Sequence, residues 1–340
     1  MIRNIIVGLV VLIVVLLLIG LMLPRTVQIS RSVVINAPPS SIFAVVDGFR
    51  QFERWSPWAE KDPNLKVEIS GPPFGVGAHY SWSGNKDVGS GTQEIIESHP
   101  YTDVKTRLTF SGFDQPSVAV MSLEPLAGQG THVTWALHSD LGGNPLWHYF
   151  GLLMDKMVGP DYERGLAHLK TLVESQAKTD FGALQVERVD LQPQTIVSVA
   201  GSATTDVDAI GKALGAAYGK VGVAMKAAGL KQVAAPVSIT RRYDEVAKVY
   251  EFDAGIPVDR ADASLPADGP AKLTKTYAGL ALKVQHQGPY ATLGKTYELI
   301  DAFKKAYGLQ DNGDSWEQYV DDPTTTPAAE VKTLIFVPVK

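Results

Sequence analysis

The chain has 340 residues, of which 45% are hydrophobic and 20% charged, and its formal net charge is −5. This length suits two ordinary domains, each with its own core. Lys and Arg are dispersed along the chain rather than gathered in a stripe, so nucleic acid is not an expected partner. Cysteine is absent, which excludes disulfides, thiolate nucleophiles and Cys-based zinc sites.

The first segment is apolar without interruption from Ile5 to Leu23. A helix of this length spans roughly 28 Å, close to the hydrocarbon thickness of a bilayer. The run ends in MLPRTVQ, which lacks the small-x-small site of a cleaved signal peptide. We therefore expect an uncleaved transmembrane anchor over residues 1–25. Basic residues flank it on both sides (Arg3, then Arg25 and Arg31). We expect a cytoplasmic N-terminus in the inner membrane and periplasmic soluble domains.

The first soluble domain is expected over residues 26–176. An alternating strand, a helix that begins at Pro38–Pro39 and six strands with Gly- and Pro-rich turns precede a long final helix. That helix is predicted to start near Leu146, to break near Gly159–Pro160 and to resume as far as Glu174. The glycines of GPPFGVG precede another strand, so we expect turns there and not a dinucleotide-binding loop. The order of elements predicts an α+β helix-grip domain.

Six motifs in this domain carry a family resemblance: NAPPSSIFAVV, WSPWAEKDP, GPPFGVGAHYSWSGN, VGSGTQEIIESHP, GTHVTW and GLAHLKTLVE. Together they resemble the SRPBCC superfamily of START-like and polyketide-cyclase-type domains. The resemblance implies a curved sheet that grips the last helix around a hydrophobic ligand cavity, and it supplies no catalytic set. Candidate ligand-binding residues in the cavity wall are Trp55, Trp58, Tyr80 and Trp82. The alternative is that the tryptophans are ordinary core or wall residues.

The second soluble domain, residues 183–340, contains an internal repeat. LGAAYGKVGVAMKAAGL (Leu214–Leu230) aligns without gaps to LGKTYELIDAFKKAYGL (Leu293–Leu309), and each copy is a helix closed by a glycine. One strand precedes each helix and two follow it, so a β-α-β-β unit is used twice. Two units predict a pseudo-symmetric antiparallel sheet with both helices on one face, leaving the other face and the seam for a groove. We expect Gly211, Gly215 and Gly219 to let the first helix approach the sheet closely.

Three segments of this half are HQGPYATLGKTYELI, WEQYVDDPTTTPAAEVKTLIFVPV and VYEFDAGIPV. They closely resemble the GyrI-like, AraC-type effector-binding domain. The resemblance implies a glutamate buried in the seam among aromatic residues, where it meets hydrophobic and often cationic ligands, and that role falls on Glu317. Further candidate ligand-binding residues are Trp316, Tyr319, Tyr290 and Tyr250. His286 is interpreted as an organiser of a turn and not as a metal ligand.

Regulators of that family carry a DNA-binding domain, whereas this chain has an anchor and a helix-grip domain in its place, so a transcriptional role is not expected. Strand alternation places Glu317 and Tyr319 on one face and Trp316 on the other. A carboxylate held in an aromatic groove costs several kcal/mol unless a cation, a hydrogen bond or protonation relieves it. A lipophilic cation would offer both charge pairing and cation–π contact. The alternative is that Glu317 faces solvent on an edge strand.

The sequence therefore predicts a membrane-anchored binding protein for hydrophobic, including cationic, small molecules or lipids. We expect no cofactor, no metal and no defined catalytic residue. Two other functions stay open. One is hydrolysis of electrophilic small molecules, with Glu317 assisting water. The other is binding and inhibition of another protein.

Overall fold

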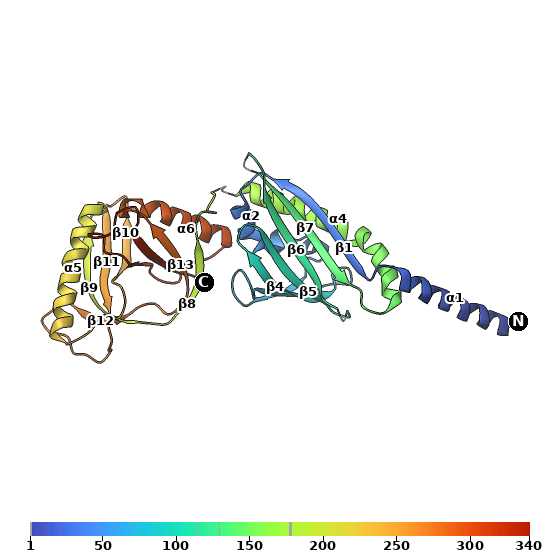
Figure 1. Cartoon of the computed structure of the whole chain (residues 1–340), viewed down its shortest axis with the longest axis horizontal. Coiled ribbons are helices and arrows are strands. Elements are labelled where there is room, and N and C mark those ends of the chain that lie inside the picture. The colour runs from blue at the N-terminus through green and yellow to red at the C-terminus, as the bar shows by residue number, and fades with distance from the viewer. Residues whose placement is uncertain (1, 114, 129, 177–178) are drawn as a thin grey trace. The chain divides into compact units, whose positions relative to one another are not determined.

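The computed structural model describes residues 2–113, 115–128, 130–176 and 179–340 (Figure 1). The chain divides into two compact units. The first comprises Met1–Gly182 and Ala302–Gly308, and the second comprises Ala183–Asp301 and Leu309–Lys340.

The first unit begins with α1 (Ile2–Met22). Over the described residues it is the one helix long and apolar enough to cross a membrane, with a mean hydropathy of 3.5 over Asn4–Met22. Almost none of this span is covered by the rest of the protein. Length and composition fit a membrane anchor, and they also fit a signal sequence near an N-terminus.

A seven-stranded antiparallel sheet follows, with the strand order β1-β7-β6-β5-β4-β3-β2. Its strands are β1 (Thr26–Ile35), β2 (Lys66–Ser70), β3 (His79–Ser83), β4 (Ser90–His99), β5 (Asp103–Phe110), β6 (Ser117–Pro125) and β7 (Thr131–Asp140). Short helices connect β1 to β2, namely α2 (Pro39–Val46), η1 (Phe52–Arg54) and α3 (Trp58–Lys61). The long helix α4 (Pro145–Ser175) packs along β1 (Figure 1). This arrangement confirms the predicted α+β architecture with its antiparallel meander.

The predicted break in the last helix of this unit is wrong, because α4 runs without interruption through Pro160. A proline inside a helix removes one backbone hydrogen bond and costs about 3 kcal/mol. Both halves of α4 bury apolar side chains, which outweighs that cost by tertiary packing. These buried side chains are Met154, Tyr162, Leu166, Leu169, Leu172 and Val173.

The second unit is built on an eight-stranded antiparallel sheet with the order β12-β9-β11-β10-β14-β15-β13-β8. The strands are β8 (Val186–Leu191), β9 (Thr195–Ala203), β10 (Val237–Asp244), β11 (Val249–Pro257), β12 (Lys272–Lys275), β13 (Gly279–Gln287), β14 (Trp316–Tyr319) and β15 (Lys332–Pro338). The helices are α5 (Val207–Ala227), the short η2 (Tyr290–Thr292) and α6 (Leu293–Tyr307), whose residues from Ala302 onward are grouped with the first unit. The first repeat supplies β9-β11-β10 and the second supplies β14-β15-β13. The two copies therefore meet at β10 and β14, as the repeat predicts.

The structure confirms the predicted glycines at the helix ends and contradicts the role predicted for three glycines inside α5. Gly229, with φ +63°, follows the helix end as predicted, and so does Gly308 after α6, with φ +65°. Gly211, Gly215 and Gly219, however, face open space, so the predicted close approach of α5 to the sheet through these residues is wrong. The glycines occupy a separate row from the buried residues that contact the sheet cluster, which are Leu214, Ala217, Val221, Ala224 and Met225.

Candidate functional site

Glu317 lies at the seam between the two repeats. β14 pairs with β10 in an antiparallel register that sets Glu317 directly opposite Ser238. Tyr319 donates a hydrogen bond to Glu317 Oε2 over 2.8 Å, so both side chains lie on one face, as alternation predicts. Tyr297 of α6 donates to Glu317 Oε1 over 3.1 Å. Both carboxylate oxygens therefore accept a phenolic hydrogen bond.

Burial raises the pKa of Glu317 above its ordinary value, although the hydrogen bonds from Tyr319 and Tyr297 act in the opposite direction. The residues around this carboxyl group are nevertheless not fully covered by protein. Glu317, Tyr218, Tyr290, Tyr297 and Tyr319 each retain part of their surface accessible. The carboxyl group is thus largely desolvated, although Glu317 as a residue is only half-buried.

Three further tyrosines complete what we call the Glu317 cluster. Tyr250 of β11 is buried, and its hydroxyl lies 2.9 Å from Ser238 Oγ. The ring of Tyr290 meets that of Tyr319 edge-on at 5.7 Å between centroids. Burial first, and then the charge of Glu317, raise the pKa of both Tyr250 and Tyr290. Tyr218 of α5 belongs here as well, because burial, Tyr250 and Glu317 raise its pKa.

Tyr218 and Tyr297 are site residues that the sequence interpretation missed, although the repeat contains the signal for both. The gap-free alignment pairs Tyr218 with Tyr297, one from each helix. Extended without a gap, it also pairs Ser238 with Glu317, the two residues that face each other across the seam. A pseudo-twofold axis thus passes between Ser238 and Glu317. One carboxylate sits beside this axis, whereas a strictly symmetric pair of glutamates would place two like charges together.

Trp316, another predicted ligand-binding residue, lies on the opposite face of the sheet. It stacks on Phe336 with 5.0 Å between ring centroids and joins a buried cluster with Ile196, Val237 and Ile239. The cluster around Glu317 draws on α5 and α6, so the site lies on the helix-bearing face. The predicted groove on the opposite face is wrong around Trp316, because buried apolar side chains occupy that part of the sheet.

His286 organises a turn, as predicted. Its Nδ1 lies 2.8 Å from Thr296 Oγ1, and its Nε2 lies 3.3 Å from Thr292 Oγ1. These contacts tie the end of β13 to η2 and to the start of α6. The turn thereby positions Tyr290 and Tyr297 beside Glu317.

The first unit contains a small cavity of about 40 Å³. Trp55 and Trp58 line it, together with Phe52, Gln93 and Trp135, whereas Tyr80 and Trp82 do not belong to its lining. Tyr80 instead packs behind the wall against Phe52, with 5.2 Å between ring centroids. A cavity of this size has room for water but not for a drug-sized ligand. Over the described residues, Trp55 Nε1 is buried without a hydrogen-bond acceptor.

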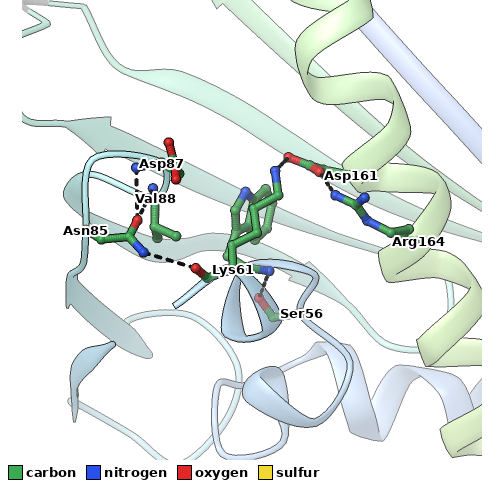
Figure 2. A network of polar contacts seen from close by, with 8 residues as sticks. Ser56, Lys61, Asn85, Asp87, Val88, Asp161 and Arg164 are labelled. Carbon is green, nitrogen blue, oxygen red and sulfur yellow. Dashed lines mark hydrogen bonds and ion pairs between the residues drawn. The ribbon is translucent and has the colours of Figure 1, made fainter. Parts of the chain in front are cut away.

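A polar network fixes the wall of this cavity. Figure 2 shows Lys61 and Arg164 converging on the buried Asp161 of α4, with Lys61 Nζ 2.6 Å from Asp161 Oδ2. Asn85 Nδ2 donates to the carbonyl of Lys61 over 3.0 Å. The helix α3, which carries Trp58, is thus tied to α4 and to the β3–β4 turn.

Comparison with protein families agrees with both architectures. Residues 26–174 match the family "Polyketide cyclase / dehydrase and lipid transport", and residues 184–340 match "GyrI-like small molecule binding domain". The chain therefore combines two domains, each of which matches one of these families. No curated protein matches the chain significantly.

Several solved structures match part of the chain. The EcmrR C-terminal domain is 21% identical with a TM-score of 0.41, and the match covers 46% of this chain and 98% of that one. EcmrR in a complex with DNA is 18% identical with a TM-score of 0.43, covering 57% and 72%. A hydrolase from Listeria innocua is 17% identical with a TM-score of 0.35, covering 46% and 92%. Similarity at this level carries no functional information.

A larger surface cavity of the GyrI-like domain, about 340 Å³, lies between α5 and the segment 266–271. Its lining includes Ala216, Gly219 and Val223, and Lys220 is its one charged residue. None of the Glu317 cluster lines it. We place the candidate site at Glu317, because a desolvated carboxylate needs a partner and an apolar surface hollow does not.

Proposed function

We propose that this chain is a membrane-anchored protein that binds a hydrophobic cation at the Glu317 cluster of its GyrI-like domain. Both of its domains belong to small-molecule-binding families, which supports a ligand-binding role. The single observation that carries the finer proposal is the environment of Glu317. Its carboxylate is desolvated and accepts two phenolic hydrogen bonds, and the residue as a whole is only half-buried.

Charge and shape both favour a cation here. Two phenolic hydrogen bonds relieve only part of the desolvation cost, since burial still dominates and raises the pKa of Glu317. A cation would pair with the carboxylate. Its apolar groups would contact the tyrosine rings, and cation–π attraction would add to the binding.

The test uses two ions of the same shape and opposite charge, tetraphenylphosphonium and tetraphenylborate. Isothermal titration of the full-length protein in one detergent is expected to show saturable binding of the phosphonium and much weaker binding of the borate. Glu317→Gln should reduce the phosphonium affinity at least tenfold, which is about 1.4 kcal/mol. Equal affinity of the wild type and the Gln variant for the phosphonium would refute the proposal.

Hydrolysis of electrophilic small molecules is a second candidate. The observation that favours it is the raised pKa of Glu317, since a carboxyl group with a pKa nearer neutrality can exchange a proton with water. Turnover of an epoxide by the wild-type protein, lost in Glu317→Gln, would support this reaction. Saturable phosphonium binding without any epoxide turnover would exclude this hydrolysis and support a binding function only.

We also propose that α1 stays attached as the anchor, with its N-terminus in the cytoplasm and both domains on the far side of the inner membrane. The absence of a small-x-small cleavage site after Leu23 supports retention of the helix. Intact mass spectrometry of membrane-extracted protein should give the full 36.6 kDa. Protease treatment of spheroplasts is expected to degrade both domains, and full protection would contradict the orientation.

A further inference from the structure

The end of α1 packs directly against the start of α4. The hydroxyl of Tyr149 donates to the carbonyl of Leu16 over 2.8 Å, and His148 Nδ1 lies 2.7 Å from the carbonyl of Gly20. Gly20 is buried, and a Cβ atom there would lie 2.6 Å from the carbonyl oxygen of Pro145. The first turn of α4 therefore touches the last two turns of α1 (Figure 1).

This contact fixes the depth of α4 relative to the apolar span. Leu16 precedes Met22, where the span ends, by about 9 Å along the helix. A side chain that reaches the carbonyl of Leu16 thus lies beside the apolar part of α1 and not beyond it. The link from α1 to β1 is also short, since α1 ends at Met22 and β1 begins at Thr26.

The first turns of α4 expose a row of apolar side chains, which we call the α4 stripe. Leu146, Phe150, Leu153 and Met157 follow each other at helical spacing, with Trp147 beside them. Leu153 is 53% exposed and Met157 is 55% exposed. Contiguous exposed apolar side chains of this kind mark an interaction surface.

Phe113, in the connection between β5 and β6, extends the stripe. Its ring lies 5.3 Å from the ring of Trp147 and 6.4 Å from that of Phe150, measured between centroids. Trp side chains such as Trp147 are enriched where a membrane meets water, because the indole ring is apolar and its N–H can donate to the headgroups. Lys156, exposed on the next turn, can reach headgroup phosphates with its ammonium group.

We propose that the α4 stripe, with Phe113, lies in the interfacial region of the same bilayer that α1 crosses. The first domain is then held against the membrane by a second contact and does not swing on a free tether. Continuity with α1 commits the stripe to lipid, because the contacts of Tyr149 and His148 with Leu16 and Gly20 hold the first turn of α4, where the stripe begins, beside the apolar span. This inference rests on the membrane anchoring proposed above.

The absence of cysteine makes a direct test possible, because one introduced cysteine can be labelled uniquely. Full-length variants Leu153→Cys, Met157→Cys, Leu12→Cys and Thr171→Cys would carry the NBD fluorophore in phosphatidylcholine–phosphatidylglycerol vesicles. Lipids brominated on the acyl chains quench a fluorophore that touches them. Thr171 is the matched control, because it is exposed on the same helix roughly 27 Å beyond Leu153.

We expect brominated lipid to reduce the emission of the Leu153→Cys and Met157→Cys labels at least twofold, as for Leu12→Cys, and to leave Thr171→Cys unchanged. Quenching at Leu12→Cys without quenching at the stripe would overturn this inference and leave the anchor intact. Absence of quenching at Leu12→Cys would overturn the anchor and the stripe together. A stripe label that is blue-shifted but unquenched would mean that protein, and not lipid, covers it.

A second variant guards against a labelling artefact. Leu153→Asp combined with Met157→Asp changes two exposed side chains and should leave the fold intact by circular dichroism. In this background a label at Phe113→Cys is expected to lose most of its quenching by brominated lipid. Unchanged quenching of that label would show that the stripe does not hold the domain on the membrane.

Discussion

Glu317 and Ser238 face each other across the seam of a duplicated sheet. Two tyrosine hydroxyls donate to the carboxylate, and yet burial still raises its pKa. In the free protein, the hydrogen bonds therefore offset only part of the desolvation cost of the Glu317 carboxylate. A ligand that brings a positive charge would lower the free energy of the site more than an uncharged ligand of the same shape.

Cation affinity at Glu317 should rise with pH. Burial raises the pKa of Glu317 above 4.5, so the free protein keeps a proton there between pH 4.5 and the raised pKa. Only the carboxylate form pairs with a cation, so affinity for tetraphenylphosphonium should climb through this interval, by at most about tenfold per pH unit, and then level off. Titrations at a series of pH values check this. The Glu317→Gln variant should give a flat profile, and a flat wild-type profile would contradict the assignment.

Folding stability without ligand should show the opposite trend. A raised pKa in the folded state means that the folded protein binds the proton more tightly than the unfolded chain. The stability contributed by this group is therefore fully present below pH 4.5 and is lost as the pH rises through the folded pKa. Urea denaturation of wild type and Glu317→Gln measures the difference in unfolding free energy between them. A difference that does not change with pH would show that Glu317 has an ordinary pKa.

Removing one phenolic donor should move the titration of Glu317 upward. The hydrogen bond from Tyr319 lowers the pKa of the carboxyl group, and a hydrogen bond to a charged group contributes about 1.5–3 kcal/mol. Tyr319→Phe should shift the midpoint of pH-dependent cation binding upward by roughly one unit or more. Tyr243→Phe is the control, because that exposed hydroxyl binds Glu245 instead. Equal midpoints in the two variants would exclude a role for Tyr319.

At the scale of elements, tertiary packing and not local helix propensity determines the length of α4 and the effect of its glycines. The helix continues through Pro160, and it bears two buried glycines with different neighbours. A Cβ at Gly165 would lie 2.8 Å from the Trp135 ring and 3.1 Å from Pro57 Cδ. A Cβ at Gly159 would meet the guanidinium of Arg31, which is the far end of a flexible side chain.

The two glycines should therefore respond differently to alanine. Replacing glycine inside a helix gains about 1 kcal/mol in propensity at either position. Gly165→Ala should nevertheless lower the unfolding free energy by about 1–3 kcal/mol, because a rigid ring and a proline must shift. Gly159→Ala should change it by less than about 1 kcal/mol, since only surface ion pairs of Arg31 with Asp155 and Glu163 are disturbed. Urea denaturation measures both, and equal effects would contradict this account.

Most elements could be predicted from sequence because they carry a clear local pattern. β5 (Asp103–Phe110), for example, alternates polar and apolar side chains along its length, and this pattern predicts a strand. The sequence does not predict the strands β8 and β12. The short and largely exposed β12 is a strand because it pairs with β9, and not because of a pattern in its own residues. Around Glu317, the family resemblance supplied Tyr319 as a candidate, and strand alternation placed it on the same face as Glu317. The repeat pairs Tyr218 with Tyr297, but their approach to Glu317 depends on where the two helices lie over the sheet, which the alignment does not specify.

At the scale of the whole molecule, the two units carry separate chemistry. Every residue of the Glu317 cluster belongs to the second unit, whereas α1 and the α4 stripe belong to the first. The cavity of the first unit, about 40 Å³, is too small for the ligand that Glu317 would accept. A hydrophobic cation should therefore stabilise one unit directly and have no site in the other.

Calorimetry of the full-length protein in detergent tests this division. Binding to the native state alone stabilises by about 2.7 kcal/mol at a free ligand concentration of 100 Kd, which raises Tm by roughly 5–10 °C for a unit of about 150 residues. Tetraphenylphosphonium should shift only the transition of the GyrI-like unit. Glu317→Gln should abolish most of that shift, while Trp58→Ala should lower the other transition and leave the shift intact. A phosphonium-dependent rise that survives in Glu317→Gln and disappears in Trp58→Ala would move the cation site to the first unit.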